Sequence, residues 1–74
     1  MLYYLIMDTS KQIGDKIKEI REKAKLTQFQ VAQKAGIHRN YFARLERGEV
    51  NPSVEIVQNI AKALKVKSGD ILPF

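Results

Sequence analysis

Apolar residues recur at helical spacing through most of this chain, with charged residues between them. Four apolar residues of the first segment fall on one face of a helix: Ile13, Ile17, Ile20 and Ala24. Thr9 stands three residues before Gln12, which fits a capping box at a helix start. The pattern therefore predicts a first helix that begins near Thr9 and ends near Lys25.

The same spacing predicts three further helices and a final turn. The helices span residues 27–35, 39–47 and 54–64, and the turn spans residues 68–72. Thr27 and Gln30 repeat the capping box, Ser53 is an N-cap, and Gly48 and Pro73 act as stops. No strand pattern is present after residue 8, so the fold is predicted to be all-α.

Gly36 stands where the second of these helices must end, directly after Ala35. A helix that turns sharply usually has its next residue in the left-handed region, which glycine enters without a Cβ clash. Ile37 offers an apolar contact back onto the helix, and Ala32 is small enough for a close helix crossing. Two helices joined by so short a turn form a helix-turn-helix. A plain three-helix junction with a glycine cap is the alternative.

Composition narrows the function. The chain has 74 residues, which is one small domain, and carries 13 Lys and Arg against 8 Asp and Glu, a net charge of +5. This excess favours a polyanionic partner, either nucleic acid or an anionic membrane surface. With no cysteine and a single histidine, we expect no enzyme, no metal site and no cofactor, and a cytoplasmic location.

Residues 1–8 are set apart from the rest by their apolar start, MLYYLIM. The run is too short to span a bilayer, so no membrane association is expected. We hypothesise that residues 2–6 form an arm, strand-like or clamped against a second subunit, ahead of a DNA-binding domain over residues 9–74. Packing on the chain's own fourth helix is the alternative, as is a translation start at Met7.

Three segments together resemble the lambda-repressor-like (Cro/C1, XRE) helix-turn-helix family: IGDKIKEIREKAKLTQFQVAQKAGI, YFARLERGEVNPSVEIVQNIAKAL and SGDIL. The run HRNYFARLERG most resembles the controller proteins of restriction–modification systems. This resemblance implies a compact five-helix domain, a symmetric homodimer, and a third helix laid in the major groove of double-stranded DNA. The expected function is a sequence-specific transcriptional regulator on a pseudo-palindromic operator.

Three side chains on the outward face of the third helix can read bases: Arg39, Asn40 and Arg44. Arginine can bond guanine O6 and N7 with two N–H groups, and asparagine can pair with adenine N6 and N7. The resemblance places these three at base-contacting positions, and Tyr41 near base edges or phosphates. An ordinary solvated helix face also carries arginines, which is the alternative.

Five residues are expected to contact phosphates: Thr27, Gln28, His38, Arg47 and Asn51. Thr27 and Gln28 open a helix whose N-terminus favours an anion, and the resemblance assigns Gln28 to the sugar-phosphate backbone. His38 occupies an N-cap position where Ser, Thr or Asp would cap better, which suggests another task, such as a bond to phosphate. For Asn51 a turn role is an equal alternative.

The resemblance also implies a brace and a dimer surface. Arg21 in the first helix matches a position commonly bridged to Glu46 in the third, and we expect this pair to orient the third helix. The implied dimer surface lies at the end of the chain: Leu64, Val66, Ile71, Leu72 and Phe74.

Two other classes of protein use the same fold. An antitoxin would bind both DNA and a protein toxin, with MLYYLIM or Phe74 as a toxin-binding surface. A protein-interaction module would be expected to lose Arg39, Asn40 and Arg44, and all three are present.

Overall fold

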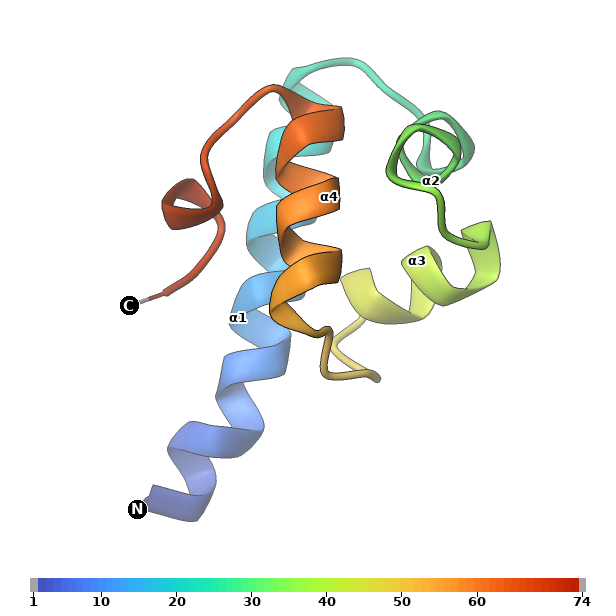
Figure 1. The fold of residues 1–74 in the computed structure, drawn as a ribbon. Helices are drawn as coiled ribbons and strands as arrows, with labels where there is room; N and C mark the ends of the chain where they lie inside the picture. Colours follow the sequence, from blue (N-terminus) through green and yellow to red (C-terminus); the bar gives the residue numbers. More distant parts are fainter. Residues whose placement is uncertain (1, 74) are drawn as a thin grey trace.

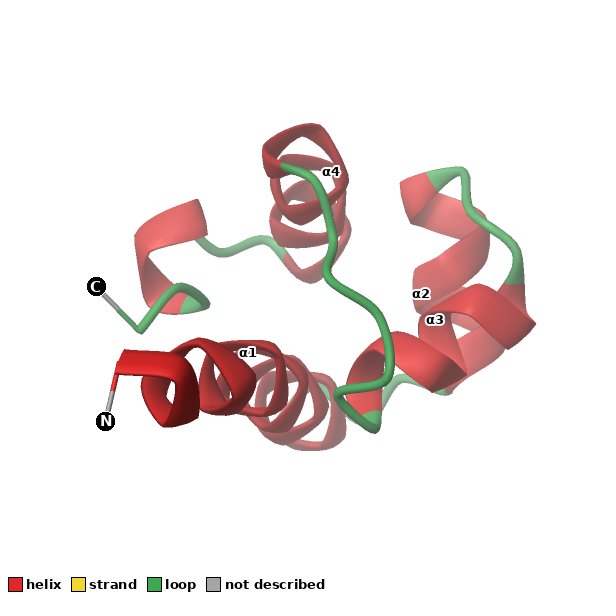
Figure 2. Ribbon diagram, turned by 90° about the horizontal axis from the view of Figure 1, so that it is seen from below, coloured by secondary structure: helices red, strands yellow, loops and turns green. Residues whose placement is uncertain are grey.

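The computed structural model describes the backbone of residues 2–73 and the side chains of residues 9–73. Four α-helices and one 3-10 helix make up this part of the chain: α1 (Leu2–Lys23), α2 (Gln28–Ala35), α3 (Arg39–Glu46), α4 (Val54–Leu64) and η1 (Ser68–Asp70). The helices α2 and α3 lie together on one side of α4, and η1 lies on the other (Figure 1). Seen from below, α1 and α4 lie apart (Figure 2).

The core is built from apolar side chains of all four helices and the C-terminal segment. Its buried members are Ile13, Ile17, Val31, Ala32, Ala35, Phe42, Leu45, Val57, Ile60, Ala61, Ala63, Leu64 and Ile71. The spacing that predicts the helices therefore also marks their buried faces. Three positions of that spacing are not buried. Ile20 is partly buried against the core, Ala24 follows the end of α1 and is exposed, and Val54 is exposed at the start of α4.

The predicted start of the first helix is wrong. The helix α1 begins at Leu2, so Thr9 lies inside it and starts nothing. The strand-like arm is likewise wrong, because residues 2–8 continue the same helix through the expected boundary at residue 8. The physical reason is that no glycine or proline precedes Gly14, and each residue added to an existing helix gains one backbone hydrogen bond.

A fifth α-helix is not present in the described part of the chain. Ser68–Asp70 forms a single 3-10 turn, and its N-cap is Lys67, one residue before the expected cap. Pro73 follows closely and lacks the N–H group that a longer helix would need. Phe74, which we expect at the dimer surface, lies outside the described residues.

Gly14 sets the distance between α1 and α3. A Cβ atom at this position would lie 2.7 Å from the backbone oxygen of Glu46, and closer still to that of Leu45. The two helices can therefore cross at this height only because residue 14 has no side chain. A glycine inside a helical pattern usually has a packing reason, so the sequence holds a signal for this contact, although the contact was not predicted.

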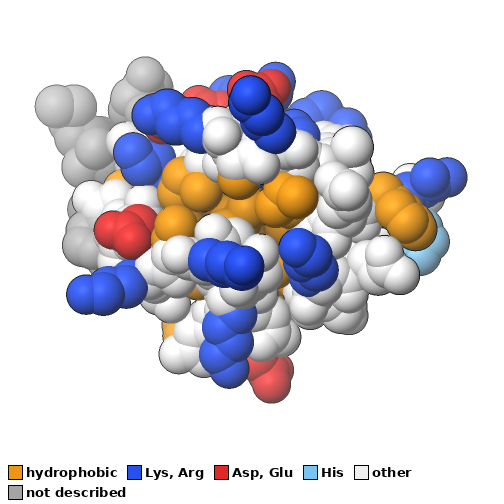
Figure 3. Space-filling model, turned by 90° about the horizontal axis from the view of Figure 1, so that it is seen from above, with side chains coloured by type: hydrophobic (Ala, Val, Ile, Leu, Met, Phe, Trp, Pro, Cys, Tyr) orange, Lys and Arg blue, Asp and Glu red, His pale blue; other side chains and the backbone are white. Residues whose placement is uncertain are grey.

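The face seen from above carries apolar side chains at its centre and Lys and Arg side chains around them (Figure 3). Among the described residues, none of the helices combines the length and apolar character needed to cross a bilayer.

Candidate nucleic-acid interface

The turn between α2 and α3 has the predicted geometry. Gly36 adopts φ 74° and ψ 29°, in the left-handed region, and its N–H bonds the carbonyl oxygens of Ala32 and Gln33. The N–H of Ile37 donates to the carbonyl of Ala32 over 3.0 Å. These bonds close the end of α2 and send the chain into α3 within three residues, so the helix-turn-helix is confirmed.

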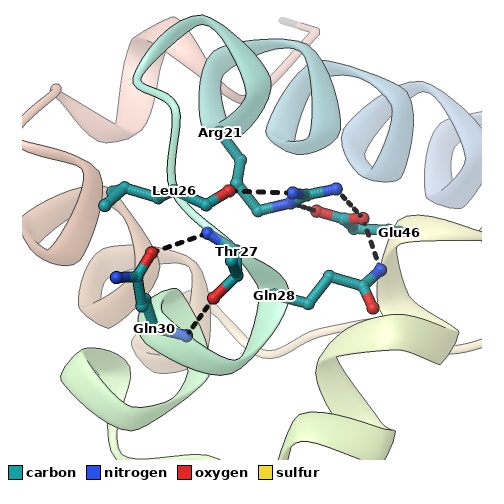
Figure 4. Close-up of polar contacts among 6 residues, drawn as sticks. All are labelled: Arg21, Leu26, Thr27, Gln28, Gln30 and Glu46. Atoms are coloured by element: carbon teal, nitrogen blue, oxygen red, sulfur yellow. Dashed lines mark hydrogen bonds and ion pairs between the residues drawn. The ribbon is translucent and has the colours of Figure 1, made fainter.

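The start of α2 is fixed by the predicted capping box (Figure 4). The Thr27 hydroxyl accepts from the N–H of Gln30 over 3.1 Å, and the Gln30 side-chain oxygen accepts from the N–H of Thr27 over 2.8 Å. The box leaves the remaining N–H groups of the first turn directed along the helix axis, where the positive end of the helix dipole favours an anion.

A cleft of 660 Å³ joins the start of α2 to the start of α3. It is lined by Arg21, Leu26, Thr27, Gln28, Phe29, Arg39, Asn40 and Ala43. Two expected phosphate contacts and two expected base contacts therefore lie around one opening. Arg39 and Asn40 are both exposed, whereas Tyr41 is half-buried against the core.

The expected brace is present, with Glu46 buried and Arg21 largely so. Arg21 Nε donates to Glu46 Oε2 over 2.6 Å, and Arg21 Nη2 donates to Glu46 Oε1 over 3.1 Å (Figure 4). A third donor, Arg21 Nη1, bonds the carbonyl of Leu26 over 2.9 Å. The Glu46 side chain is 2% exposed and that of Arg21 11%, and the bond to Glu46 raises the pKa of Arg21 above its usual value. The pair ties α1, the loop after it and α3 into one frame.

Gln28 belongs to the same frame, which was not predicted from the sequence. Its side-chain Nε2 donates to Glu46 Oε1 over 2.8 Å (Figure 4). The amide expected to contact phosphate is therefore held by Glu46 of α3. No local pattern connects residues 28 and 46, because their contact exists only after α2 and α3 have packed together.

His38 caps α3 after all. Its backbone has φ −71° and ψ 140°, and its Nδ1 accepts from the N–H of Asn40 over 3.0 Å. An imidazole that accepts through Nδ1 in its neutral form carries its hydrogen on Nε2. The ring is exposed, so His38 keeps one N–H donor, at Nε2, that its cap does not use.

Arg44 and Arg47 share the carboxylate of Glu49, a contact that the sequence did not predict. Arg47 Nε lies 2.6 Å from Glu49 Oε2, and Arg44 Nε lies 3.5 Å from Glu49 Oε1. The hydrogen bond from Arg47 lowers the pKa of Glu49, and the same bond raises the pKa of Arg47. All three side chains are about half exposed, so the contact is open to competition from another anion.

A second cleft, of 330 Å³, has Arg47 in its lining together with Gln28 and Glu46. Its lining residues are Lys11, Asp15, Lys18, Gln28, Glu46 and Arg47. The two lysines are further cations beside the expected phosphate contacts, and neither was predicted to lie there. Their spacing of seven residues on one helix face is a signal that could have found them. Asn51 also contacts α1, where its Oδ1 accepts from the Ser10 hydroxyl over 3.2 Å.

Comparison with known proteins places this geometry in a family. The helix-turn-helix family profile matches residues 17–71, which includes every helix except the first part of α1. The chain belongs to the Cro/C1 (XRE) helix-turn-helix family.

Two relatives of this helix-turn-helix chain have informative names. An immunity repressor protein of Bacillus phage phi105 is 42% identical over 60 residues, which cover 81% of the chain and 42% of that repressor. The control protein C.BamHI of Bacillus amyloliquefaciens is 37% identical over 62 residues, which cover 82% of the chain and 76% of that protein. The chain thus spans less than half of the phage repressor and about three quarters of the control protein.

Among solved structures, the restriction-modification controller protein C.AhdI from Aeromonas hydrophila superposes with a TM-score of 0.83 and 27% identity. The superposition covers 85% of this chain and 96% of that one. The same arrangement of helices is therefore shared by the two members of the family.

The expected dimer residues of this helix-turn-helix chain differ in burial. Leu64 and Ile71 are buried in the core, and Val66 and Leu72 are half-buried. Leu72 also lines an apolar cleft of 410 Å³ together with Val54 and Val57 of α4.

Proposed function

We propose that this chain is a sequence-specific DNA-binding transcriptional regulator that acts as a homodimer on a pseudo-palindromic operator. The observation that carries the proposal is the cleft between α2 and α3, where exposed Arg39 and Asn40 stand beside the capped start of α2. A helix that presents base-reading side chains next to an anion-binding helix end can fix its register on phosphates and read bases in one docking event. The net charge of +5 supports the same partner.

The proposed base contacts are made by Arg39, Asn40, Arg44 and Tyr41 of α3. Arg39 and Asn40 have the donors and acceptors that suit guanine and adenine in the major groove. Arg44 reaches a base only after it leaves Glu49, 3.5 Å away. Tyr41 contributes through its hydroxyl, since its ring packs against the core.

The proposed phosphate contacts surround this face: Thr27, Gln28, His38, Arg47 and Asn51. Gln28 donates one amide hydrogen to Glu46, so its second amide hydrogen is the one offered to a phosphate. His38 offers Nε2–H, because Nδ1 serves the helix cap. Arg47 exchanges Glu49 for a phosphate oxygen.

The proposed dimer brings two copies of α3 into successive major grooves. That geometry requires the two helices to lie about 34 Å apart, which is one turn of DNA. The apolar cleft of 410 Å³ and the half-buried side chains of Val66 and Leu72 support an interface at the C-terminal end. Residues 2–8 extend α1 beyond the rest of the fold (Figure 1) and are a second candidate for contact with the partner copy.

Selection of bound duplexes from a random DNA pool at physiological salt tests the proposal. We expect a two-fold-symmetric site with half-site centres about one helical turn apart. The matched control is Arg39→Ala with Asn40→Ala, two exposed positions whose change leaves the fold intact and abolishes the selection. If the wild-type protein enriches no sequence, base reading is refuted, and the helix-turn-helix serves a protein partner such as a toxin.

A further inference from the structure

Phe29 and Arg39 come from different helices and meet in the cleft between α2 and α3. Phe29 is the second residue of α2 and is 53% exposed. A single exposed apolar side chain is ordinary on a protein surface, so its exposure alone indicates no function. The contact with Arg39 does indicate a function. The guanidinium carbon of Arg39 lies 5.9 Å from the centre of the Phe29 ring, over its face. Both side chains line the same opening.

Arg39 is held differently from the other two arginines on or beside α3. Arg44 and Arg47 point N–H groups at the Glu49 carboxylate. Within the described side chains Arg39 forms no ion pair, and its contact is with a π face, which attracts the cation without accepting a directed hydrogen bond. The ring therefore positions the guanidinium while its N–H groups remain available to another acceptor.

We propose that Phe29 is a positioning residue that orients Arg39 for recognition of guanine. The inference rests on the proposed function. It adds that the base recognised by Arg39 is guanine. A guanidinium bonds guanine O6 and N7 through two N–H groups in one plane, and an aromatic ring against its face restricts that plane before DNA arrives. Phe29 thereby acts on specificity at one base pair, through Arg39, without contacting the base itself.

The DNA test compares Phe29→Leu, which keeps an apolar side chain, with Phe29→Tyr, which keeps the ring. The duplex is the one enriched from the random pool, and the relevant base pair is the one at which Arg39→Ala relaxes the preference. We expect Phe29→Leu to reduce the preference for guanine there by about two- to fivefold. Affinity for random DNA and the melting temperature should stay unchanged, and Phe29→Tyr should behave as wild type.

A double-mutant comparison shows whether Phe29 works through Arg39. In an Arg39→Ala background, Phe29→Leu should cause no further loss, since the two changes remove one interaction. The free protein gives a second readout without DNA. The side-chain proton resonances of Arg39 should be shifted upfield by the ring in wild type and in Phe29→Tyr, and should lose that shift in Phe29→Leu.

The possible failures are distinguishable. A wild-type protein that enriches no duplex refutes the proposed function, and the role of Phe29 falls with it. A wild-type protein that selects guanine, beside a Phe29→Leu variant that selects it equally well, refutes the role of Phe29 alone. Equal losses on selected and random duplexes, or a loss that persists undiminished in Arg39→Ala, would also refute it, because the ring would then contact the DNA backbone independently.

Discussion

Two glutamates three residues apart hold arginines in opposite ways. Glu46 is buried, accepts from Arg21 and from Gln28, and ties together three helices. Glu49 is exposed and holds Arg44 and Arg47 at the surface. A buried pair loses much if one partner is removed, because the remaining charge has no water to solvate it. An exposed pair contributes little to stability. The carboxylate of Glu46 therefore stabilises the fold, whereas that of Glu49 makes contacts that another anion can displace.

The largest expected effect comes from Glu46→Ala. Removal of the carboxylate leaves the largely buried Arg21 guanidinium without a counter-charge, and we expect the free energy of unfolding to fall by about 3 kcal/mol. This is the low end of the range for buried pairs, because Arg21 also lines the open cleft. Chemical denaturation followed by circular dichroism measures it. The sequence predicts only that the pair orients α3, and its burial adds a contribution to stability.

The matched control for Glu46→Ala removes both charges, in Arg21→Met with Glu46→Leu. Apolar replacements of a buried pair often leave stability unchanged, so this variant should fold while Gln28 loses its acceptor on α3. We expect it to bind DNA more weakly than wild type at equal stability. Unchanged DNA affinity in the folded double variant would contradict a role of the frame in orienting α2.

Gly14→Ala tests the close packing of α1 against α3. The added methyl group would press on the backbone oxygens of Leu45 and Glu46, which cannot move independently of α3. We expect a loss of about 1–3 kcal/mol, as for other overpacked sites. Gly69→Ala is the control, because a Cβ at residue 69 meets no atom within 4 Å. Equal melting temperatures for the two variants would show that α1 and α3 can separate without cost.

Glu49→Gln tests the displaceable contact. Without the carboxylate, Arg44 and Arg47 no longer need to leave a partner before they meet DNA. The melting temperature should stay the same, and affinity for DNA should rise on selected and random duplexes alike. Arg47→Ala should reduce the slope of log affinity against log salt by about 0.9, the value for one phosphate. A weaker complex for Glu49→Gln would mean that Glu49 positions the arginines.

The smallest effect is the titration of Glu49 itself. Because its folded pKa lies below the ordinary 4.5, the contact adds stability above the unfolded-state pKa and loses it as pH falls through the folded value. Carboxyl-carbon NMR should show that Arg47→Ala raises the Glu49 midpoint more than Arg44→Ala does, since the Arg47 hydrogen bond is the main cause. The reverse order would place Arg44 as the principal partner.

Contacts between residues close in the sequence could be predicted, and most contacts between distant residues could not. The turn at Gly36 and the cap at Thr27 were predictable because their hydrogen bonds join residues within a few positions of each other. The Arg21–Glu46 pair was predictable only through family resemblance, and its geometry is confirmed. The Gln28 bond to Glu46, the Glu49 contacts and the place of Asn51 depend on how helices cross and loops fold, which local pattern does not encode.

Local signals misled at the chain start. Thr9 and Gln12 have the spacing of a helix start, yet a capping box is needed only where a helix begins, and α1 has already begun at Leu2. His38 misled in the other direction. Its side chain is an uncommon cap by residue type but supplies the required acceptor through Nδ1.

The close crossing at Gly14 couples the position of α1 to that of α3. At 1.5 Å per residue, the 22 residues of α1 span roughly 33 Å, close to the longest extent of the molecule, 36 Å. The part of α1 around Gly14 lies against α3, and residues 2–8 extend past the rest of the fold (Figure 1). Because α1 is one continuous helix, a displacement of residues 2–8 would be transmitted along it to the crossing with α3 at Gly14.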